Sequence, residues 1–204
     1  MPAVSDEFWD RVIILVDMNC FFAQIEQQDN PFWRNRPVAI TNGKLGSTII
    51  TSSYEARAYG VKTGMRLKEA RVLCPELIQA PSRPHRYVEK STQIMQALEK
   101  ITPDLEIYSV DEAFLDVTHC QSLLGTPETI AKLVKKTVSD ASGLTCSVGV
   151  SGDKTTAKFA AKLNKPDGLT VIKPWEAEAR LADEPVTELS GIAKGIGTFL
   201  NKFG

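Results

Sequence analysis

The tetrapeptide Ser109-Val110-Asp111-Glu112 lies between two runs typical of β-strands, Ile107 to Val110 and Ala113 to Val117. Neighbouring side chains of one continuous strand point to opposite faces of a sheet. Asp111 and Glu112 can therefore share a ligand only where the backbone turns or bulges. We expect a tight hairpin centred on this acidic pair.

A third carboxylate follows an apolar run near the start of the chain. Asp17 ends the run Val12-Ile-Ile-Leu-Val16, whose length and β-branching are typical of a buried strand. If the fold brings this run beside the hairpin, three carboxylates meet, and Mg²⁺ prefers such oxygen ligands together with water and substrate phosphates. An isolated Asp-Glu pair is more often solvated surface, but the strand-like flanks favour a metal site and an enzyme of phosphate chemistry.

Composition restricts the class of protein. The chain has 204 residues, 43% of them hydrophobic, with a formal net charge of −1, which allows one large domain or two small ones. No apolar run approaches the ~18 residues of a membrane span, and the acidic N-terminus is unlike a signal peptide. We expect a cytoplasmic protein without a membrane partner. The four cysteines are widely separated without a CxxC motif, so neither a disulfide framework nor a zinc site is expected.

The order of apolar runs and turn signals predicts an α+β fold. The expected elements are strand 11–17, helix 20–28, strand 37–41, an apolar stretch 47–51, a helix capped by Ser52 or Ser53 and closed by Gly60, helices 67–73 and 85–100, hairpin 106–117, helix 127–141, strand 145–151, helix 153–164 and strand 168–172. Segment 42–80 is interpreted as an inserted, mostly helical subdomain. The remaining order is the split βαβ pattern of a ferredoxin-like sheet, which would place Asp17 and Asp111 at one edge.

Two further patterns suggest contacts with phosphate. Lys154, Lys158 and Lys162 recur every four residues and would form one positive stripe on a helix, facing either phosphate or solvent. Segment 189–204 has the glycine spacing of a helix-hairpin-helix, whose backbone N–H groups commonly hold a DNA phosphate. Because the chain stops without the partner helices of that motif, we expect a fragment of a longer protein.

Five segments in order resemble the Y-family lesion-bypass DNA polymerases, in the DNA polymerase IV branch. They are Val16-Asp17-Met-Asn-Cys-Phe-Phe-Ala23, Ser53-Tyr-Glu-Ala-Arg57 with Gly60-Val-Lys-Thr-Gly64, Tyr108-Ser-Val-Asp-Glu-Ala-Phe-Leu-Asp116, Ser147-Val-Gly-Val-Ser151, and Lys158 through Lys165-Pro-Asp-Gly168. The resemblance implies that 1–41 and 81–173 form a catalytic palm, 42–80 the fingers, and 174–204 the beginning of a helical thumb with a truncated helix-hairpin-helix. The little finger of the family would be absent.

The resemblance implies a template-directed DNA polymerase of the translesion type, which adds deoxynucleotides to a primer 3′-OH in DNA damage tolerance. Asp17, Asp111 and Glu112 would be catalytic and would hold two Mg²⁺ ions, for which Mn²⁺ can substitute, with the Met18 carbonyl as a fourth ligand. Two such ions stabilise the attacking and leaving oxygens of an in-line displacement. Expected partners are primer-template DNA, deoxynucleoside triphosphates, and a sliding clamp reached through a region beyond this chain.

The same resemblance assigns nucleotide and DNA contacts. The nucleotide-binding residues would be Cys20, Phe21, Phe22, Thr51, Tyr54, Arg57 and Lys165, with Phe22 as the steric gate against a 2′-OH. Backbone N–H groups of Cys20 to Phe22 start a helix, where phosphate is readily bound. Lys154, Lys158, Gly191 and Lys194 would contact DNA, and Thr48 and Ile50 would cover the base pair. Without the metal cluster, Tyr54 and Phe22 would be ordinary core aromatics and Arg57 a surface ion pair.

Two positions depart from the family pattern, and two other functions compete. Asn19 stands where many relatives have a second Asp, and Ala193 replaces a glycine of the hairpin motif. One alternative is a catalytically silent relative that acts as a binding or scaffold protein in DNA repair. The other is a palm-type nucleotide cyclase or phosphohydrolase. For this chain alone we expect weak, salt-sensitive DNA binding.

Overall fold

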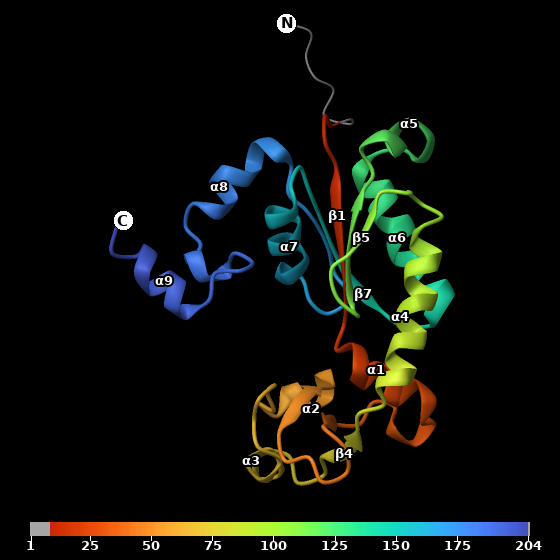
Figure 1. Ribbon diagram of the computed structural model, residues 1–204, viewed down its shortest axis with the longest axis vertical. Coiled ribbons are helices and arrows are strands. Elements are labelled where there is room, and N and C mark those ends of the chain that lie inside the picture. The colour runs from red at the N-terminus through yellow and green to blue at the C-terminus, as the bar shows by residue number, and fades with distance from the viewer. Residues whose placement is uncertain (1–8, 204) are drawn as a thin grey trace, which may run out of the picture. The chain divides into compact units, whose positions relative to one another are not determined.

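The computed structural model describes residues 9–203 (Figure 1). The chain divides into two compact units: unit 1 comprises the N-terminal segment as far as Met18 together with Thr92 onward, and unit 2 comprises Asn19–Ser91. The chain therefore leaves unit 1 after one strand and returns to it 73 residues later, within a helix.

Unit 1 is built on a five-stranded sheet. Its strands are β1 (Ile13–Met18), β5 (Leu105–Ile107), β6 (Glu112–Asp116), β7 (Cys146–Ser151) and β8 (Leu169–Val171), in the order β5-β6-β1-β7-β8. The central strand β1 runs antiparallel to both β6 and β7, whereas β8 is parallel to β7. The first four strands of this order form the predicted split βαβ arrangement, which confirms the α+β, ferredoxin-like expectation, and β8 adds a fifth strand at one edge.

Helices lie on both faces of this sheet (Figure 1). They are α4 (Pro84–Leu98), whose last turns belong to unit 1, α5 (Gln121–Leu124), α6 (Pro127–Ser142) and α7 (Lys154–Leu163). On one face, Ala157 and Ala161 of α7 join a buried cluster with Ile13, Leu15 and Phe114 of the sheet. The helix comes so close because β7 carries a glycine there.

Gly149 of β7 allows this close approach. A Cβ atom at this position would lie 2.0 Å from the carbonyl oxygen of Ala157 and 2.4 Å from the backbone nitrogen of Ala161. Both neighbours are helix backbone, which cannot rotate away as a side chain can. The predicted segment Ser147 to Ser151 thus fixes how α7 lies on the sheet.

The C-terminal part of unit 1 is formed by short helical elements. A 3₁₀ turn at Pro174–Glu176 precedes α8 (Ala177–Leu181), and a second at Val186–Glu188 precedes α9 (Lys194–Leu200). Ala177 and Leu181 of α8 pack against the buried Phe159, Ala160 and Ile172. The assignment of 174–204 to the beginning of a thumb stays a prediction.

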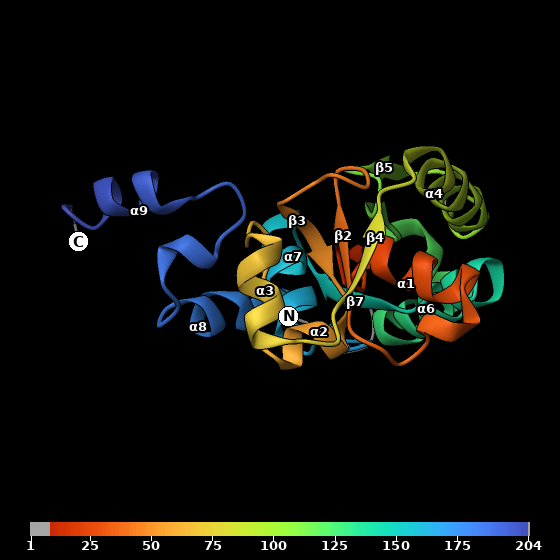
Figure 2. The ribbon, with the colours of Figure 1, turned by 90° about the horizontal axis from the view of Figure 1, so that it is seen from below.

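Unit 2 contains a three-stranded sheet, so the expectation that 42–80 is mostly helical was wrong. Strands β2 (Val38–Thr41), β3 (Ile49–Ser52) and β4 (Ile78–Pro81) lie in the order β3-β2-β4 (Figure 2). Strand β2, expected with the palm, pairs here antiparallel to β3 and parallel to β4. β4 has four residues that include a glutamine and a proline, so its local sequence is a weak signal for a strand. Pairing with β2, which is distant in the sequence, stabilises the extended conformation of β4.

Three helices pack on this small sheet. Helices α2 (Tyr54–Ala58) and α3 (Leu67–Leu73) share a buried cluster with Ala39 and Ile49, while the start of α1 (Phe21–Asp29) packs with Val38 and Ile40. Adjacent residues of β2 therefore face opposite clusters, as the two-residue period of a strand requires. The Ser53 hydroxyl accepts the Ala56 N–H and caps α2, which confirms the predicted helix start.

Within residues 9–203, no helix has the length and apolar character needed to cross a membrane. All four cysteines are free thiols, and three of them are buried.

Candidate active site

The two acidic segments meet at one end of the central strands. Asp17 and Glu112 are direct partners in the antiparallel β1–β6 register. The Met18 N–H donates to the Asp111 carbonyl oxygen at 3.0 Å, and the Tyr108 and Ser109 N–H groups both donate to the Glu112 carbonyl oxygen. The predicted hairpin is confirmed, with its loop at 108–111 and Glu112 as the first residue of β6.

Each of the two facing carboxylates is paired with a lysine. Lys165 Nζ lies 2.5 Å from Asp17 Oδ2, and Lys158 Nζ lies 2.7 Å from Glu112 Oε2. The Lys158 ammonium also lies 4.2 Å from the centroid of the Tyr108 ring, a cation–π distance. The Asp17 and Glu112 side chains are only 13% and 15% exposed, so these pairs are screened less than surface pairs.

Burial dominates the ionisation of Asp17. Desolvation raises its pKa to about 6, against the lowering effect of Lys165 and with a further raising effect from Glu112. A carboxylate is expensive to bury beside a second carboxylate unless positive charge is close. The end of β1 is thus a place where added positive charge is favourable.

Asp111 is differently placed. The Ser109 hydroxyl donates to Asp111 Oδ1 at 2.7 Å, and the Asp111 N–H donates back to Ser109 Oγ at 3.3 Å. Among residues 9–203, no three side chains of His, Cys, Asp or Glu come close enough to hold one metal ion. The donor set at the strand ends still suits a hard cation, because Asp17 and Glu112 are adjacent oxygen ligands that each attract a cationic group. A shared metal set of Asp17, Asp111, Glu112 and the Met18 carbonyl stays a prediction.

Unit 2 brings three predicted nucleotide contacts together. Arg57 donates from Nη2 to Thr51 Oγ1 at 3.4 Å and from Nε to the Ser52 carbonyl at 3.0 Å. Its guanidinium carbon lies 4.8 Å from the centroid of the Tyr54 ring. Backbone and ring contacts therefore hold the guanidinium, whose side chain remains exposed at the surface. A guanidinium fixed in this way is suited to phosphate oxygens.

The start of α1 lies beside these residues. Phe22 and Tyr54 pack on one buried cluster that includes Cys20 and Val38. Burial raises the pKa of the Cys20 thiol to about 11, so it is an apolar residue and not a nucleophile. Phe22 is half-buried and stacks on Tyr87, with ring centroids 4.2 Å apart and planes 12° apart.

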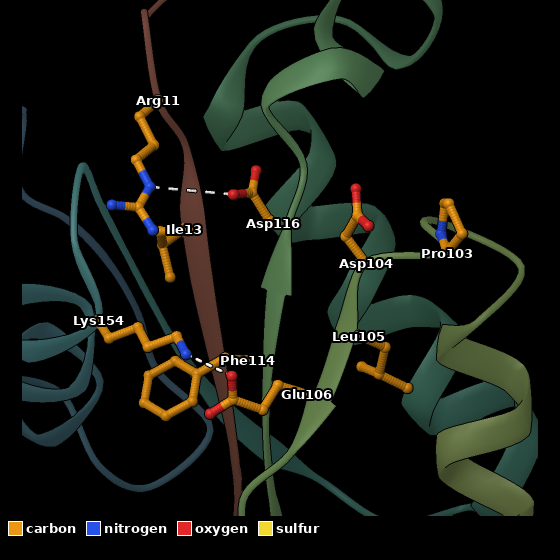
Figure 3. Close-up of a pocket in the computed structure, with 9 residues that line it drawn as sticks. All are labelled: Arg11, Ile13, Pro103, Asp104, Leu105, Glu106, Phe114, Asp116 and Lys154. Carbon is orange, nitrogen blue, oxygen red and sulfur yellow. Dashed lines mark hydrogen bonds and ion pairs between the residues drawn. The ribbon is translucent and has the colours of Figure 1, made fainter.

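The other predicted contacts are more scattered. Lys154 pairs with Glu106 beside a hollow of about 420 Å³ that Arg11, Ile13 and Phe114 help to line (Figure 3). Lys194 begins α9, and Gly191 has a φ of +87°. Thr48 and Ile50 are exposed.

Sequence reasoning missed two relationships. It included Tyr87 only as part of the helix expected at 85–100, and it assigned Lys158 to a stripe facing phosphate or solvent. The partners of both residues are distant in the chain, and the spacing within their own helices did not indicate them.

Comparison with known protein families identifies the family of this chain. A model of the impB/mucB/samB family matches residues 16–162. The chain belongs to the impB/mucB/samB family. DNA polymerase IV of Moorella thermoacetica is 40% identical over 96% of this chain and 50% of its own length. DNA polymerase IV of Lactococcus lactis subsp. cremoris (strain MG1363) is 39% identical over the whole chain and 56% of its own length.

Solved structures agree with this membership of the impB/mucB/samB family. A Y-family DNA polymerase chimera, Dbh-Dpo4(243-245)-Dbh, superposes with a TM-score of 0.86 and 34% identity over 95% of this chain and 58% of its own. An insertion ternary complex of Dbh DNA polymerase gives 0.85, with 34% identity over 95% of this chain and 58% of its own. The resemblance to Y-family polymerases and the expected fold are confirmed. The chain spans about half the length of the curated relatives it matches.

Proposed function

We propose that this chain is the catalytic portion of a template-directed DNA polymerase of the translesion type. The carrying observation is the pairing of Asp17 with Glu112 at the ends of β1 and β6, in a chain of this family. The reaction would join a deoxynucleotide to a primer 3′-OH with release of pyrophosphate, in DNA damage tolerance. Its substrates would be primer-template DNA and deoxynucleoside triphosphates.

Each unit would supply part of the chemistry. Asp17, Asp111 and Glu112, with the Met18 carbonyl, would hold two Mg²⁺ ions. When bound, the metals would neutralise phosphate charge and lower the energy of the displacement. Lys158 and Lys165 of the chain itself would add to this charge neutralisation, because their ammonium groups already form ion pairs with Glu112 and Asp17.

The residues of unit 2 would bind and orient the nucleotide. Arg57, held by Thr51 and Tyr54, would hold the phosphate oxygens, and N–H groups at the start of α1 would add donors. Phe22 would lie under the sugar and exclude a 2′-OH. Only Met18 and Asn19 lie between Asp17 and Cys20 in the sequence, so a short segment links the proposed metal ligands to the proposed phosphate donors of α1. Positioning and charge neutralisation account for most of such a phosphoryl reaction.

The test is insertion of one deoxynucleotide on a primed template in a single turnover, with excess protein, low salt and Mg²⁺. Parent chain, Asp111→Asn and Glu106→Gln are compared. Glu106 is the control because it pairs with Lys154 of α7, as Glu112 pairs with Lys158, yet is not a proposed metal ligand. Insertion by the parent and by Glu106→Gln, with none by Asp111→Asn, is expected.

One observation favours a second candidate, a catalytically silent DNA-binding relative: the facing carboxylates are paired with lysines, and no three-ligand group is present in residues 9–203. The insertion assay separates the two functions. DNA binding by a folded parent without any Mg²⁺-dependent insertion, even after C-terminal domains of a relative are joined to it, would replace the polymerase by the silent relative.

A further inference from the structure

Phe22 is the outermost member of a chain of contacts that ends on a buried charge. Its ring stacks on Tyr87, which is 3% exposed. The Tyr87 hydroxyl donates to Glu26 Oε1 at 2.8 Å, and Glu26 is 4% exposed. Arg83 Nε donates to the same oxygen at 2.8 Å. All four residues belong to unit 2.

A buried carboxylate needs a reason to be there, since a buried charge is costly unless it is paired and hydrogen-bonded. Glu26 has an ion-pair partner in Arg83, which neutralises its charge, and a hydrogen-bond donor in the Tyr87 hydroxyl. Arg83 is held in turn by Asp29, which also forms a two-bond contact with Arg86. The network fixes the tilt of the Tyr87 ring at its hydroxyl end.

The orientation of Tyr87 decides where Phe22 can lie. The two rings are nearly parallel, so rotation of the Tyr87 plane would either tilt Phe22 or open a gap beneath it. Burial, together with the hydrogen bond to Glu26, raises the pKa of the Tyr87 phenol. The hydroxyl therefore stays protonated near neutral pH and keeps its hydrogen bond to Glu26.

We propose that Glu26 is a positioning residue for sugar selection: through Tyr87 it fixes the Phe22 ring and thereby sets the discrimination between deoxyribonucleotides and ribonucleotides. This inference rests on the proposed function. It adds a buried carboxylate, remote from the substrate, to the residues that determine specificity. A small displacement of a packed aromatic ring is enough for such an effect, because a 2′-OH is excluded by contact distance alone.

The variants separate the anchor from general stability. Tyr87→Phe removes only the hydroxyl, Glu26→Ala removes the acceptor, and Glu26→Gln keeps an acceptor oxygen for Tyr87. Asp29→Asn is the matched control, because it weakens the same arginine network without touching Tyr87. Two readouts are taken on each folded variant: the ratio of deoxyribonucleotide to ribonucleotide insertion, and proton NMR contacts and ring-current shifts of Phe22 against residue 87.

We expect Tyr87→Phe and Glu26→Ala to lower the insertion ratio about tenfold, which corresponds to roughly 1.4 kcal/mol, and to weaken the ring-current shift of Phe22. Glu26→Gln should restore most of the ratio, and Asp29→Asn should keep the parent value. An unchanged ratio in Tyr87→Phe, or an equal loss in Asp29→Asn, would overturn the inference. If Glu26→Ala does not fold, Tyr87→Phe alone decides.

The two readouts also separate this inference from the proposed function. A folded parent chain that inserts no nucleotide even after C-terminal domains of a relative are joined to it refutes the polymerase proposal, while the NMR comparison still decides whether Glu26 positions Phe22. Parent insertion with an unmoved Phe22 resonance in Tyr87→Phe and Glu26→Ala refutes the positioning role and leaves the polymerase proposal intact.

Discussion

Asp17 lies directly opposite Glu112 in the β1–β6 pair, and each of these carboxylates has its own lysine. Burial, helped by the charge of Glu112, raises the pKa of Asp17 to about 6, although Lys165 acts to lower it. The pairing is therefore not a device for stability. It keeps two acidic side chains together at a cost that grows when both are ionised.

The first prediction is a fall in stability with rising pH. Because the folded pKa of Asp17, about 6, exceeds its ordinary value of 3.8, the folded state keeps a proton that the unfolded state has lost between these values. The stabilising contribution is complete below the unfolded pKa and disappears as pH rises through the folded one. At about 1.4 kcal/mol per pH unit, we expect a loss of roughly 2–3 kcal/mol.

Urea unfolding of the parent and of Asp17→Asn in metal-free buffer measures this loss. The free energy of unfolding of the parent should fall relative to that of Asp17→Asn from about pH 4 to pH 6. Parallel curves for the two proteins over this range would contradict a raised pKa at Asp17.

A second prediction concerns divalent ions. If Asp17 and Glu112 hold Mg²⁺, MgCl₂ should raise the free energy of unfolding at pH 8, by about 1.4 kcal/mol at ten times the dissociation constant. Thermal unfolding with and without MgCl₂ checks this. Asp17→Asn and Glu112→Gln should lose the response, whereas Glu106→Gln, which removes the partner of Lys154, should retain it. An equal response in all four proteins would show that the ion binds elsewhere.

A third prediction concerns Arg57. Its fixed guanidinium contacts Thr51 and Tyr54, and a lost hydrogen bond to a charged group costs about 1.5–3 kcal/mol. Arg57→Ala should therefore raise the KM for the nucleotide by about one to two orders of magnitude with a smaller effect on kcat. Arg57→Lys should recover only part of the loss, because an ammonium lacks the planar fork. Steady-state insertion kinetics give both constants, and an unchanged KM in Arg57→Ala would exclude this role.

Phe22→Ala gives the fourth prediction. Removing the ring should admit ribonucleotides, since nothing in the remaining side chain occupies the space beside the sugar. The measurement compares insertion of a deoxyribonucleotide and a ribonucleotide opposite the same template base. Phe32→Ala serves as control, because Phe32 is an exposed phenylalanine of unit 2 with no proposed substrate contact. Unchanged sugar discrimination in Phe22→Ala would refute the steric gate.

The fifth prediction is structural. Gly149→Ala should destabilise the chain by about 3 kcal/mol or more, because the new methyl group meets helix backbone and overpacking of a rigid site is costly. Gly195→Ala is the control: a Cβ there meets nothing within 4 Å, and alanine in a helix should stabilise by up to about 1 kcal/mol. Urea unfolding compares the two; similar small effects would mean that α7 can move away from β7.

The sequence predicts local elements with a strong signal. Helix 67–73 has the predicted bounds, and the Asp-Glu hairpin forms between the two expected runs. In each, the signals come from adjacent residues: apolar spacing and a stopping proline in one, two strand-like runs flanking an acidic turn in the other.

What sequence reasoning missed depends on distant partners. Strand β4 exists because β2 pairs with it, and Tyr87 has its role because Phe22 and Glu26 lie on another helix. The lysine partners of Asp17 and Glu112 were likewise assigned to other ligands. Spacing within α7 places Lys154, Lys158 and Lys162 in one stripe. It cannot say that the first two reach Glu106 and Glu112 of the sheet while Lys162 donates to the Glu188 carbonyl.

The central position of β1 has a consequence for the order of events during synthesis. Both neighbours of β1 in the sheet, β6 and β7, are encoded far downstream, so the first strand to leave the ribosome cannot pair with β6 until residue 116 has been made, nor with β7 until residue 151 has been made. Unit 2 is a continuous segment and can fold earlier. Chain closure over such a long loop delays non-local pairing. The apolar strand Ile13–Met18 must therefore stay without its sheet partners while the whole of unit 2 is synthesised.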